Sequence, residues 1–70
     1  MKRQWRKGPP PEIGWWPASG VQDHTAIRWW DGHMWSCPAI PFDSAEDAAS
    51  AANKISQFQD RIEWTDRWWL

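Results

Sequence analysis

The alternation of apolar and polar residues predicts a β-hairpin near the middle of this 70-residue chain. Residues 25–37, TAIRWWDGHMWSC, place β-branched and aromatic side chains on both sides of Asp31 and Gly32. An Asp-Gly pair at this place favours a two-residue type I′ turn, because both central residues of that turn need a positive φ. Such a turn would place Trp30 opposite His33.

The predicted hairpin has two different faces. One face holds Ile27, Trp29 and Met34, and we expect it to be the core side. The other face carries cationic, aromatic and imidazole side chains: Arg28, Trp30, His33 and Trp35. With a two-residue turn, Arg28 would lie opposite Trp35 as a cation–π pair. A three-residue loop with a glycine bulge would shift the register, so both turn lengths stay open at this point.

The segments before and after the hairpin predict two further strands. Residues 12–16, EIGWW, form a short aromatic run that Pro17 stops, which is typical of a strand at a sheet edge. Residues 61–65, RIEWT, alternate between polar and apolar side chains and predict the final strand.

Residues 42–58, FDSAEDAASAANKISQF, predict a helix capped by Asp43 or Ser44, with an acidic residue three positions later. Helical spacing gives this segment a stripe of mostly small side chains: Ala45, Ala48, Ala49, Ala52 and Ile55. Small side chains let a helix approach a sheet that carries bulky tryptophans. The expected order is β-β-β-α-β, in the α+β class, with a Trp-rich antiparallel sheet packed on one Ala-rich helix.

We expect one ordered α+β domain over residues 12–70, preceded by a basic, Pro-rich N-terminal tail over residues 1–11. Three consecutive prolines, Pro9–Pro11, favour an extended polyproline II rod. Charge divides near the same place, because residues 1–7 carry four basic and no acidic residues. Residues 8–70 carry four basic and nine acidic residues, a net charge of −5.

Tryptophan is the most unusual part of the composition. Nine tryptophans occur, at positions 5, 15, 16, 29, 30, 35, 64, 68 and 69. A domain of this length has a small interior, and Cys37 stands alone, so no intrachain disulfide adds stability. Buried indoles can supply much of the core, but we expect several to stay exposed. Exposed tryptophans are typical of binding surfaces.

Residues 14–20, GWWPASG, and 27–36, IRWWDGHMWS, resemble the short Trp-rich domain of unknown function found in actinobacterial envelope proteins. That domain has the pattern Gly-Trp-Tyr-Pro-Asp-Pro, followed by Arg-Tyr/Trp-Trp-Asp-Gly-x-x-Trp-Thr. Ala18 stands where the family has an acidic residue, and no membrane helix accompanies the match. The chain is also loosely similar to small accessory proteins of bacteriophages and prophages. The first resemblance implies a hairpin module, the second a phage or prophage setting, and neither implies an activity.

Metal and nucleophile chemistry have few candidate residues. His24, His33 and Cys37 have the spacing H-x8-H-x3-C, whereas a structural zinc site needs four ligands, commonly in close pairs. Cys37 could be written with a histidine and an aspartate as a triad, but triads are defined by geometry. A thiol before Pro38 at a strand end is typical of an inert, semi-buried cysteine. We therefore expect no enzyme activity, no metal site and no cofactor.

The sequence favours a non-enzymatic, small protein-interaction module that binds a protein partner. The expected binding residues are the second hairpin face and the aromatic pair near the C-terminus: Arg28, Trp30, His33, Trp35, Trp68 and Trp69. Pro9–Pro11 would dock on this tryptophan face, either within the same chain or on a second copy in a homodimer.

An alternative function is binding of single-stranded nucleic acid through the N-terminal segment. The residues concerned combine positive charge with one stacking ring: Lys2, Arg3, Trp5, Arg6 and Lys7. The acidic remainder of the chain would repel a phosphate backbone. No apolar run predicts a membrane span, and no apolar stretch follows the basic start as in a secretory signal. A single cysteine fits a reducing compartment, so we expect a cytoplasmic protein without membrane contact.

Overall fold

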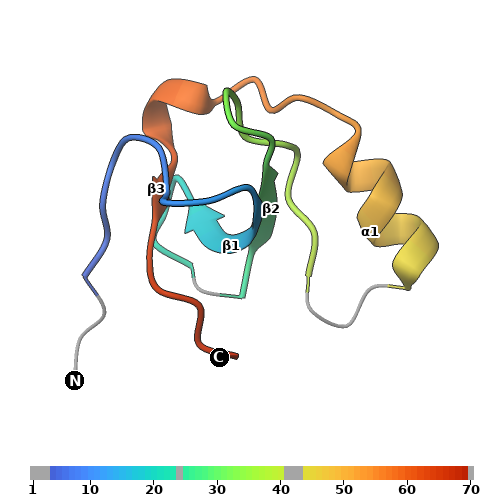
Figure 1. Ribbon diagram of the computed structural model, residues 1–70, viewed down its shortest axis with the longest axis horizontal. Helices are drawn as coiled ribbons and strands as arrows, with labels where there is room; N and C mark the ends of the chain where they lie inside the picture. Colours follow the sequence, from blue (N-terminus) through green and yellow to red (C-terminus); the bar gives the residue numbers. More distant parts are fainter. Residues whose placement is uncertain (1–3, 24, 41–43, 70) are drawn as a thin grey trace.

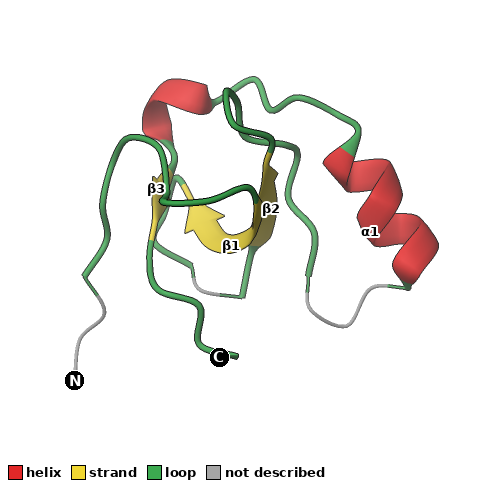
Figure 2. Cartoon of the chain, in the orientation of Figure 1, coloured by secondary structure: helices red, strands yellow, loops and turns green. Residues whose placement is uncertain are grey.

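The computed structural model of the protein describes residues 4–23, 25–40 and 44–69. In chain order its elements are β1 (Gly14–Ser19), β2 (Ile27–Trp30), α1 (Ala45–Ala52), the 3-10 helix η1 (Gln59–Arg61) and β3 (Glu63–Trp64). The strands form one antiparallel sheet, and α1 lies beside it (Figure 2). This arrangement confirms the predicted α+β class.

β1 is the central strand, with β2 on one side and β3 on the other. The prediction of an edge strand stopped by Pro17 is therefore wrong. Both backbone groups of Ile27, the partner of Pro17 in β2, bond instead to Ala39, so this pair needs no donor from Pro17. On the β3 side, the Pro17 carbonyl accepts the Thr65 N–H at 3.1 Å. The reciprocal bond from Pro17 to Thr65 cannot form, so the proline removes one hydrogen bond at the end of the pairing between β1 and β3.

The strand predicted after the hairpin turn is present as isolated bridges along the outer edge of β2. Trp35 pairs with Trp30, and Ala39 pairs with Ile27. The bridged segment has one more residue between its two pairs than β2 has, so a bulge interrupts the ladder. The observed order is therefore β-β-α-β, with this bridged segment in place of the third strand.

The hairpin turn contains four residues, 31–34, and not two. The Asp31 carboxylate Oδ1 accepts the backbone N–H of His33 at 2.7 Å and that of Met34 at 2.8 Å. Gly32 has a φ of 102°, but Asp31 does not have the positive φ that a type I′ turn needs. The predicted turn type is wrong because the aspartate side chain itself supplies the hydrogen bonds of a longer turn.

The longer turn moves the hairpin register by two residues. Trp30 lies opposite Trp35 and not opposite His33, so the expected Arg28–Trp35 pair does not form. A shift of two residues keeps Arg28, Trp30 and Trp35 on one face, because side chains alternate along a strand.

The burial of the two faces is the reverse of the prediction. Arg28, Trp30 and Trp35, expected on the outer face, are 8%, 9% and 4% exposed. On the expected core face, Met34 is 44% exposed and Trp29 is only half-buried. The hairpin therefore contributes its Arg-Trp face to the core.

The core consists mainly of indole rings from all three strands and the bridged segment. Its members are Trp16, Ala18, Trp30, Trp35, Ile62 and Trp64. Trp16 contacts Trp64 edge-on, with centroids 5.2 Å apart, and Trp30 lies 5.0 Å from Trp35. These tilted contacts let large rings fill a small interior.

Helix α1 begins at Ala45 and is capped by Ser44, one of the two predicted caps, whose hydroxyl accepts the Asp47 N–H at 3.2 Å. The other predicted cap, Asp43, lies outside the described residues. The helix ends at Ala52 and does not continue to Phe58, because the following residues pair with the bridged segment.

None of the residues of α1 is buried. The alanine stripe faces the sheet without closing against it, since the hollow between them is lined by Ala45, Ala48, Ala49 and Ala52. The helix therefore leaves space beside the sheet.

Residues 4–8, in the described part of the expected tail, lie against β3 (Figure 1). Arg6 forms a backbone bridge with Trp64, with hydrogen bonds of 2.8 and 2.9 Å. The Gln4 carbonyl accepts the Thr65 hydroxyl at 3.0 Å. This segment thus adds backbone pairing to the outer edge of β3.

Candidate functional site

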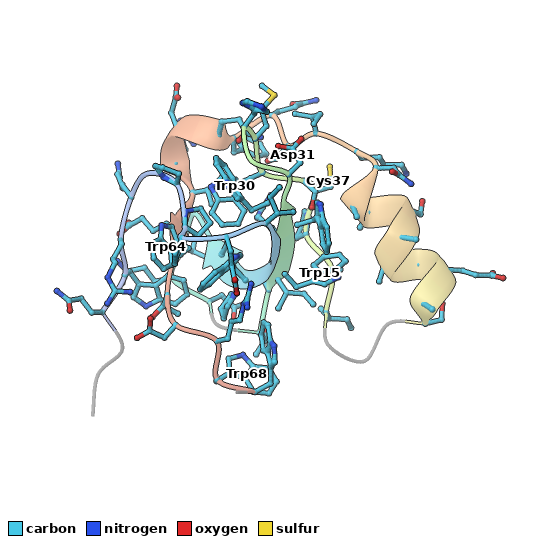
Figure 3. All side chains as sticks on the ribbon, in the orientation of Figure 1. Trp15, Trp30, Asp31, Cys37, Trp64 and Trp68 are labelled. Carbon is cyan, nitrogen blue, oxygen red and sulfur yellow. The ribbon has the colours of Figure 1, made fainter. Side chains whose placement is uncertain are left out.

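The sheet presents a second face, opposite the core, on which aromatic rings remain open. Trp15 of β1 and Trp29 of β2 are direct cross-strand partners on this face. Their rings meet edge-on, with centroids 5.5 Å apart, and both side chains are half-buried. Figure 3 shows Trp15 between the sheet and α1, with Trp30 and Trp64 on the other side.

Two hollows lie on this face and share Trp15 as a common wall. The first, of about 420 Å³, lies between the Trp15–Trp29 pair and the alanine stripe of α1, with Asn53 at its edge. The second, of about 310 Å³, is lined by Trp15, Ile27, Trp68 and Trp69. We call the shared surface the open tryptophan face, formed by Trp15, Ile27, Trp29, Trp68 and Trp69.

The C-terminal pair is the most exposed part of this face. Trp68 is 41% exposed and Trp69 is 40% exposed. The two rings meet edge-on, with centroids 5.1 Å apart. Because each ring supports the other, both can stay at the surface with a defined shape.

Arg67 holds the C-terminal segment against β1. Its Nε donates to the Trp15 carbonyl at 2.9 Å, and its Nη1 bonds the Glu12 carboxylate at 2.6 Å. The guanidinium also lies 3.9 Å from the centroid of the Trp16 ring. Trp68 and Trp69 follow directly in the chain, so Arg67 positions them beside Trp15.

The open tryptophan face has hydrogen-bond donors that find no acceptor within the described residues. The buried indoles of Trp16 and Trp64 donate to the carbonyls of Glu12 and Gly8. Neither Trp15 nor Trp29, at the centre of the open face, has such a bond within the described part of the chain. The face therefore combines apolar walls with indole N–H groups that an incoming molecule can use.

The predicted site residues separate into buried and exposed groups. Arg28, Trp30 and Trp35 lie in the core and leave little surface for a partner. The Arg28 guanidinium donates to the Ala18 carbonyl at 3.2 Å and the Ser36 carbonyl at 2.9 Å. Burial lowers the pKa of Arg28 from its ordinary value, with nearby Cys37 acting in the opposite direction. These bonds explain how a cation fits into the core.

His33, Trp68 and Trp69 are the predicted site residues that stay exposed. His33 lies in the hairpin turn, whereas the two tryptophans belong to the open tryptophan face. The structure therefore does not bring the six predicted residues together.

The residues proposed for nucleic-acid binding are only partly described. Lys2 and Arg3 lie outside the described residues. Trp5 is half-buried, and Lys7 is exposed. Arg6 bonds the Asp66 carboxylate at 3.1 Å, and its guanidinium lies 5.1 Å from the centroid of the Trp64 ring. The positive charge of Arg6 is thus already compensated by an acidic group of the same chain.

The candidate metal and nucleophile residues show no common geometry. Among the residues that the structure describes, no three His, Cys, Asp or Glu side chains gather into a possible metal site. His24 lies outside the described residues. The Cys37 thiol contacts the Ile55 carbonyl at 3.7 Å, and the Asp31 carboxylate serves the hairpin turn.

The proline segment lies on the core side of the sheet. Pro10 is buried, and the Gly8 carbonyl accepts the Trp64 indole N–H at 3.0 Å. A hollow of about 210 Å³ beside it is lined by Gly8, Pro9, Trp30, His33, Trp35, Gln59 and Ile62. This segment therefore lines the same hollow as Trp30 and Trp35, two of the tryptophans that the sequence analysis expected on the outside.

Sequence reasoning missed Trp15, Trp29 and Arg67 as parts of the site. The surplus of tryptophans indicated that some had to be exposed, but it did not identify them. Arg67 had no local signal, because its contacts join residues more than fifty positions apart.

No helix in the described part of the chain is long and apolar enough to cross a membrane. Comparison of the chain with models of protein families, with curated proteins and with solved structures finds no match.

Proposed function

We propose that the protein is a non-enzymatic interaction module that binds a protein partner through the open tryptophan face. The observation that carries this proposal is the exposure of Trp68 and Trp69 beside the half-buried Trp15–Trp29 pair. The partner-binding surface then lies on the opposite side of the sheet from the hairpin face that the sequence suggested.

The exposed area is large enough to matter for binding. A tryptophan at 40% exposure leaves on the order of 100 Å² of side-chain surface in contact with water. Covering that area stabilises a complex by about 2.5 kcal/mol for each ring. Two such rings in one patch resemble a binding hot spot, where a few aromatic anchors supply most of the affinity.

The electrostatics favour a protein over a nucleic acid. Residues 8–70 carry a net charge of −5, and α1 adds Glu46 and Asp47 in its first turn. A phosphate backbone would be repelled by this surface, whereas an uncharged or basic polypeptide segment would not. The single thiol supports the cytoplasm as the proposed compartment.

The test is selection from a random peptide library displayed on phage, using the full-length chain as bait. We expect enriched peptides whose binding is lost in the Trp68→Ala/Trp69→Ala double variant. Both rings are exposed, so this variant should keep the fold of the parent protein.

Phe58→Ala is the matched control, because Phe58 is also an exposed aromatic residue, at 55%, but does not line either hollow. Peptide binding should survive this substitution. Enriched peptides that bind the double variant as well as the parent chain would refute the proposed face. A selection that yields no binders would also count against an interaction module.

A further inference from the structure

The open tryptophan face is selective in the chemistry that it offers. Its walls are indole rings, Ile27 and alanine methyl groups, and Asn53 is the one polar side chain lining the two described hollows. The Trp15 and Trp29 indole N–H groups make no hydrogen bond to a described residue, and among the lining side chains only that of Asn53 has an acceptor oxygen. A well-matched ligand therefore supplies carbonyl oxygens and apolar surface, with few N–H groups of its own.

Proline-rich segments have this combination. Proline has no backbone N–H, and its ring adds apolar surface beside a free carbonyl. Such segments form an extended polyproline II helix before binding, so they lose little conformational entropy on an aromatic surface.

The molecule already contains one contact of this kind, on its core side. The Trp64 indole N–H donates to the Gly8 carbonyl at 3.0 Å, next to Pro9 and the buried Pro10. A proline-containing segment and an indole are thus matched once within this chain. Trp15 and Trp29 offer the same donor groups, and these make no hydrogen bond to a described residue.

We propose that the open tryptophan face binds a proline-rich segment of a partner protein in the polyproline II conformation. This inference rests on the proposed function and names the chemistry of its partner. The first hollow accepts prolines between the Trp15–Trp29 pair and α1, and the second accepts them between Trp15 and Trp68–Trp69. The indole N–H groups of Trp15 and Trp29 donate to the segment's carbonyls.

Size and charge complete the description of the ligand. A polyproline II segment of about eight residues is ~25 Å long, so it is long enough to span the molecule along its shorter extents of 23 and 21 Å. Because the body of the chain is acidic, a basic residue at one end of the segment adds electrostatic attraction.

In the experiment, the full chain is labelled with the NMR-active isotope of nitrogen. It is then titrated with a synthetic peptide of about eight prolines and one terminal arginine. Proton–nitrogen NMR follows the indole N–H signal of each tryptophan. We expect the Trp15 and Trp29 signals to move as they gain acceptors. The Trp16 and Trp64 signals should stay in place, because these groups already donate within the chain.

A Gly-Ser peptide of equal length with the same terminal arginine is the ligand control, and it should bind at least tenfold more weakly. The Trp69→Ala variant should also weaken binding of the proline peptide about tenfold, whereas Phe58→Ala should not. Equal binding of both peptides would overturn the inference. Movement of the Trp64 signal in place of those of Trp15 and Trp29 would also overturn it, because the peptide would then replace Gly8–Pro10.

The two proposals fail in different ways. If the proline peptide does not bind, but library peptides of another composition need Trp68 and Trp69, the proline inference is wrong and the interaction face stands. If no peptide of any composition depends on these residues, both proposals are wrong.

Discussion

Arg67 is predicted to contribute more to stability than Arg6, which likewise pairs with a carboxylate and an indole ring. It bonds the Trp15 carbonyl and the Glu12 carboxylate, and it lies over the Trp16 ring. Its side chain is only 13% exposed. Replacing it with alanine removes three contacts and leaves one carbonyl without its donor.

The expected loss can be estimated contact by contact. The hydrogen bond from a charged donor contributes about 1.5–3 kcal/mol, and the cation–π contact about 0.5–2 kcal/mol. The Glu12 partner is 63% exposed, so the ion pair adds at most about 1 kcal/mol. Since these contacts share one side chain, we expect a net loss of about 2–4 kcal/mol for Arg67→Ala.

This loss is large for so small a domain. A domain of this length unfolds with a free energy of about 4–10 kcal/mol, and each kcal/mol lost lowers Tm by about 4–8 °C. The Arg67→Ala variant should therefore melt about 10–25 °C below the parent chain. Thermal unfolding followed by circular dichroism measures the shift.

Arg6→Ala is the matched control, because Arg6 also combines a carboxylate with an indole. Its side chain is 39% exposed, the Asp66 carboxylate is 75% exposed, and the indole centroid lies 5.1 Å away. We expect a loss of about 0.5–1 kcal/mol for this variant. If Arg67→Ala lowered Tm no more than Arg6→Ala, the reasoning from burial would be refuted.

Three further predictions concern the hairpin. Hydrogen bonds from the Met34 and His33 backbone lower the pKa of Asp31 below 3.8. The stability that this carboxylate adds is present above that pH. It is lost as the pH falls through the lowered pKa that Asp31 has in the folded protein. Urea unfolding should show a steeper acid loss for the parent than for Asp31→Asn, and parallel profiles would contradict this. Gly32→Ala should lower the free energy of unfolding by about 1–2 kcal/mol, because the φ of Gly32 is 102°. The added Cβ would make only an ordinary contact with Ile13, so the loss comes from the backbone conformation. An unchanged Tm would count against this strain. Trp35→Ala should cost about 3–5 kcal/mol, since the ring is 4% exposed, and native-like stability in urea would show that the ring is not a core residue.

Local signals predicted the parts of the fold that depend on neighbouring residues. The spacing to the acidic residues predicted Asp43 or Ser44 as the helix cap, and the structure shows the capping hydrogen bond at Ser44. Alternation assigned the hairpin side chains to the correct faces even though the turn length was wrong. A two-residue error in register leaves the faces of the strand residues unchanged, so the face assignment did not depend on the predicted turn length.

The choice between the two faces could not be made locally. Both faces of the hairpin carry tryptophan, and Arg28 made one of them look external. In the structure, the Arg28 guanidinium donates to the carbonyls of Ala18 and Ser36, ten and eight residues away in the sequence, and Arg28 is only 8% exposed. Such long-range contacts leave no periodic signal, so the sequence could indicate an exposed tryptophan face but not which one.

The pairing of Arg6 with Trp64 has a consequence for the speed of folding. The central strand β1 also cannot complete its pairing until β3 is present, because Ala18 pairs with Trp64 and Ser19 with Glu63. A chain emerging from the ribosome can form its hairpin early, but its core stays open until residues 63–65 appear. Pairing between such distant segments requires closure of a large loop, which slows folding. For its size, this domain should therefore fold late and slowly, with several tryptophans exposed to water until the last strand is added.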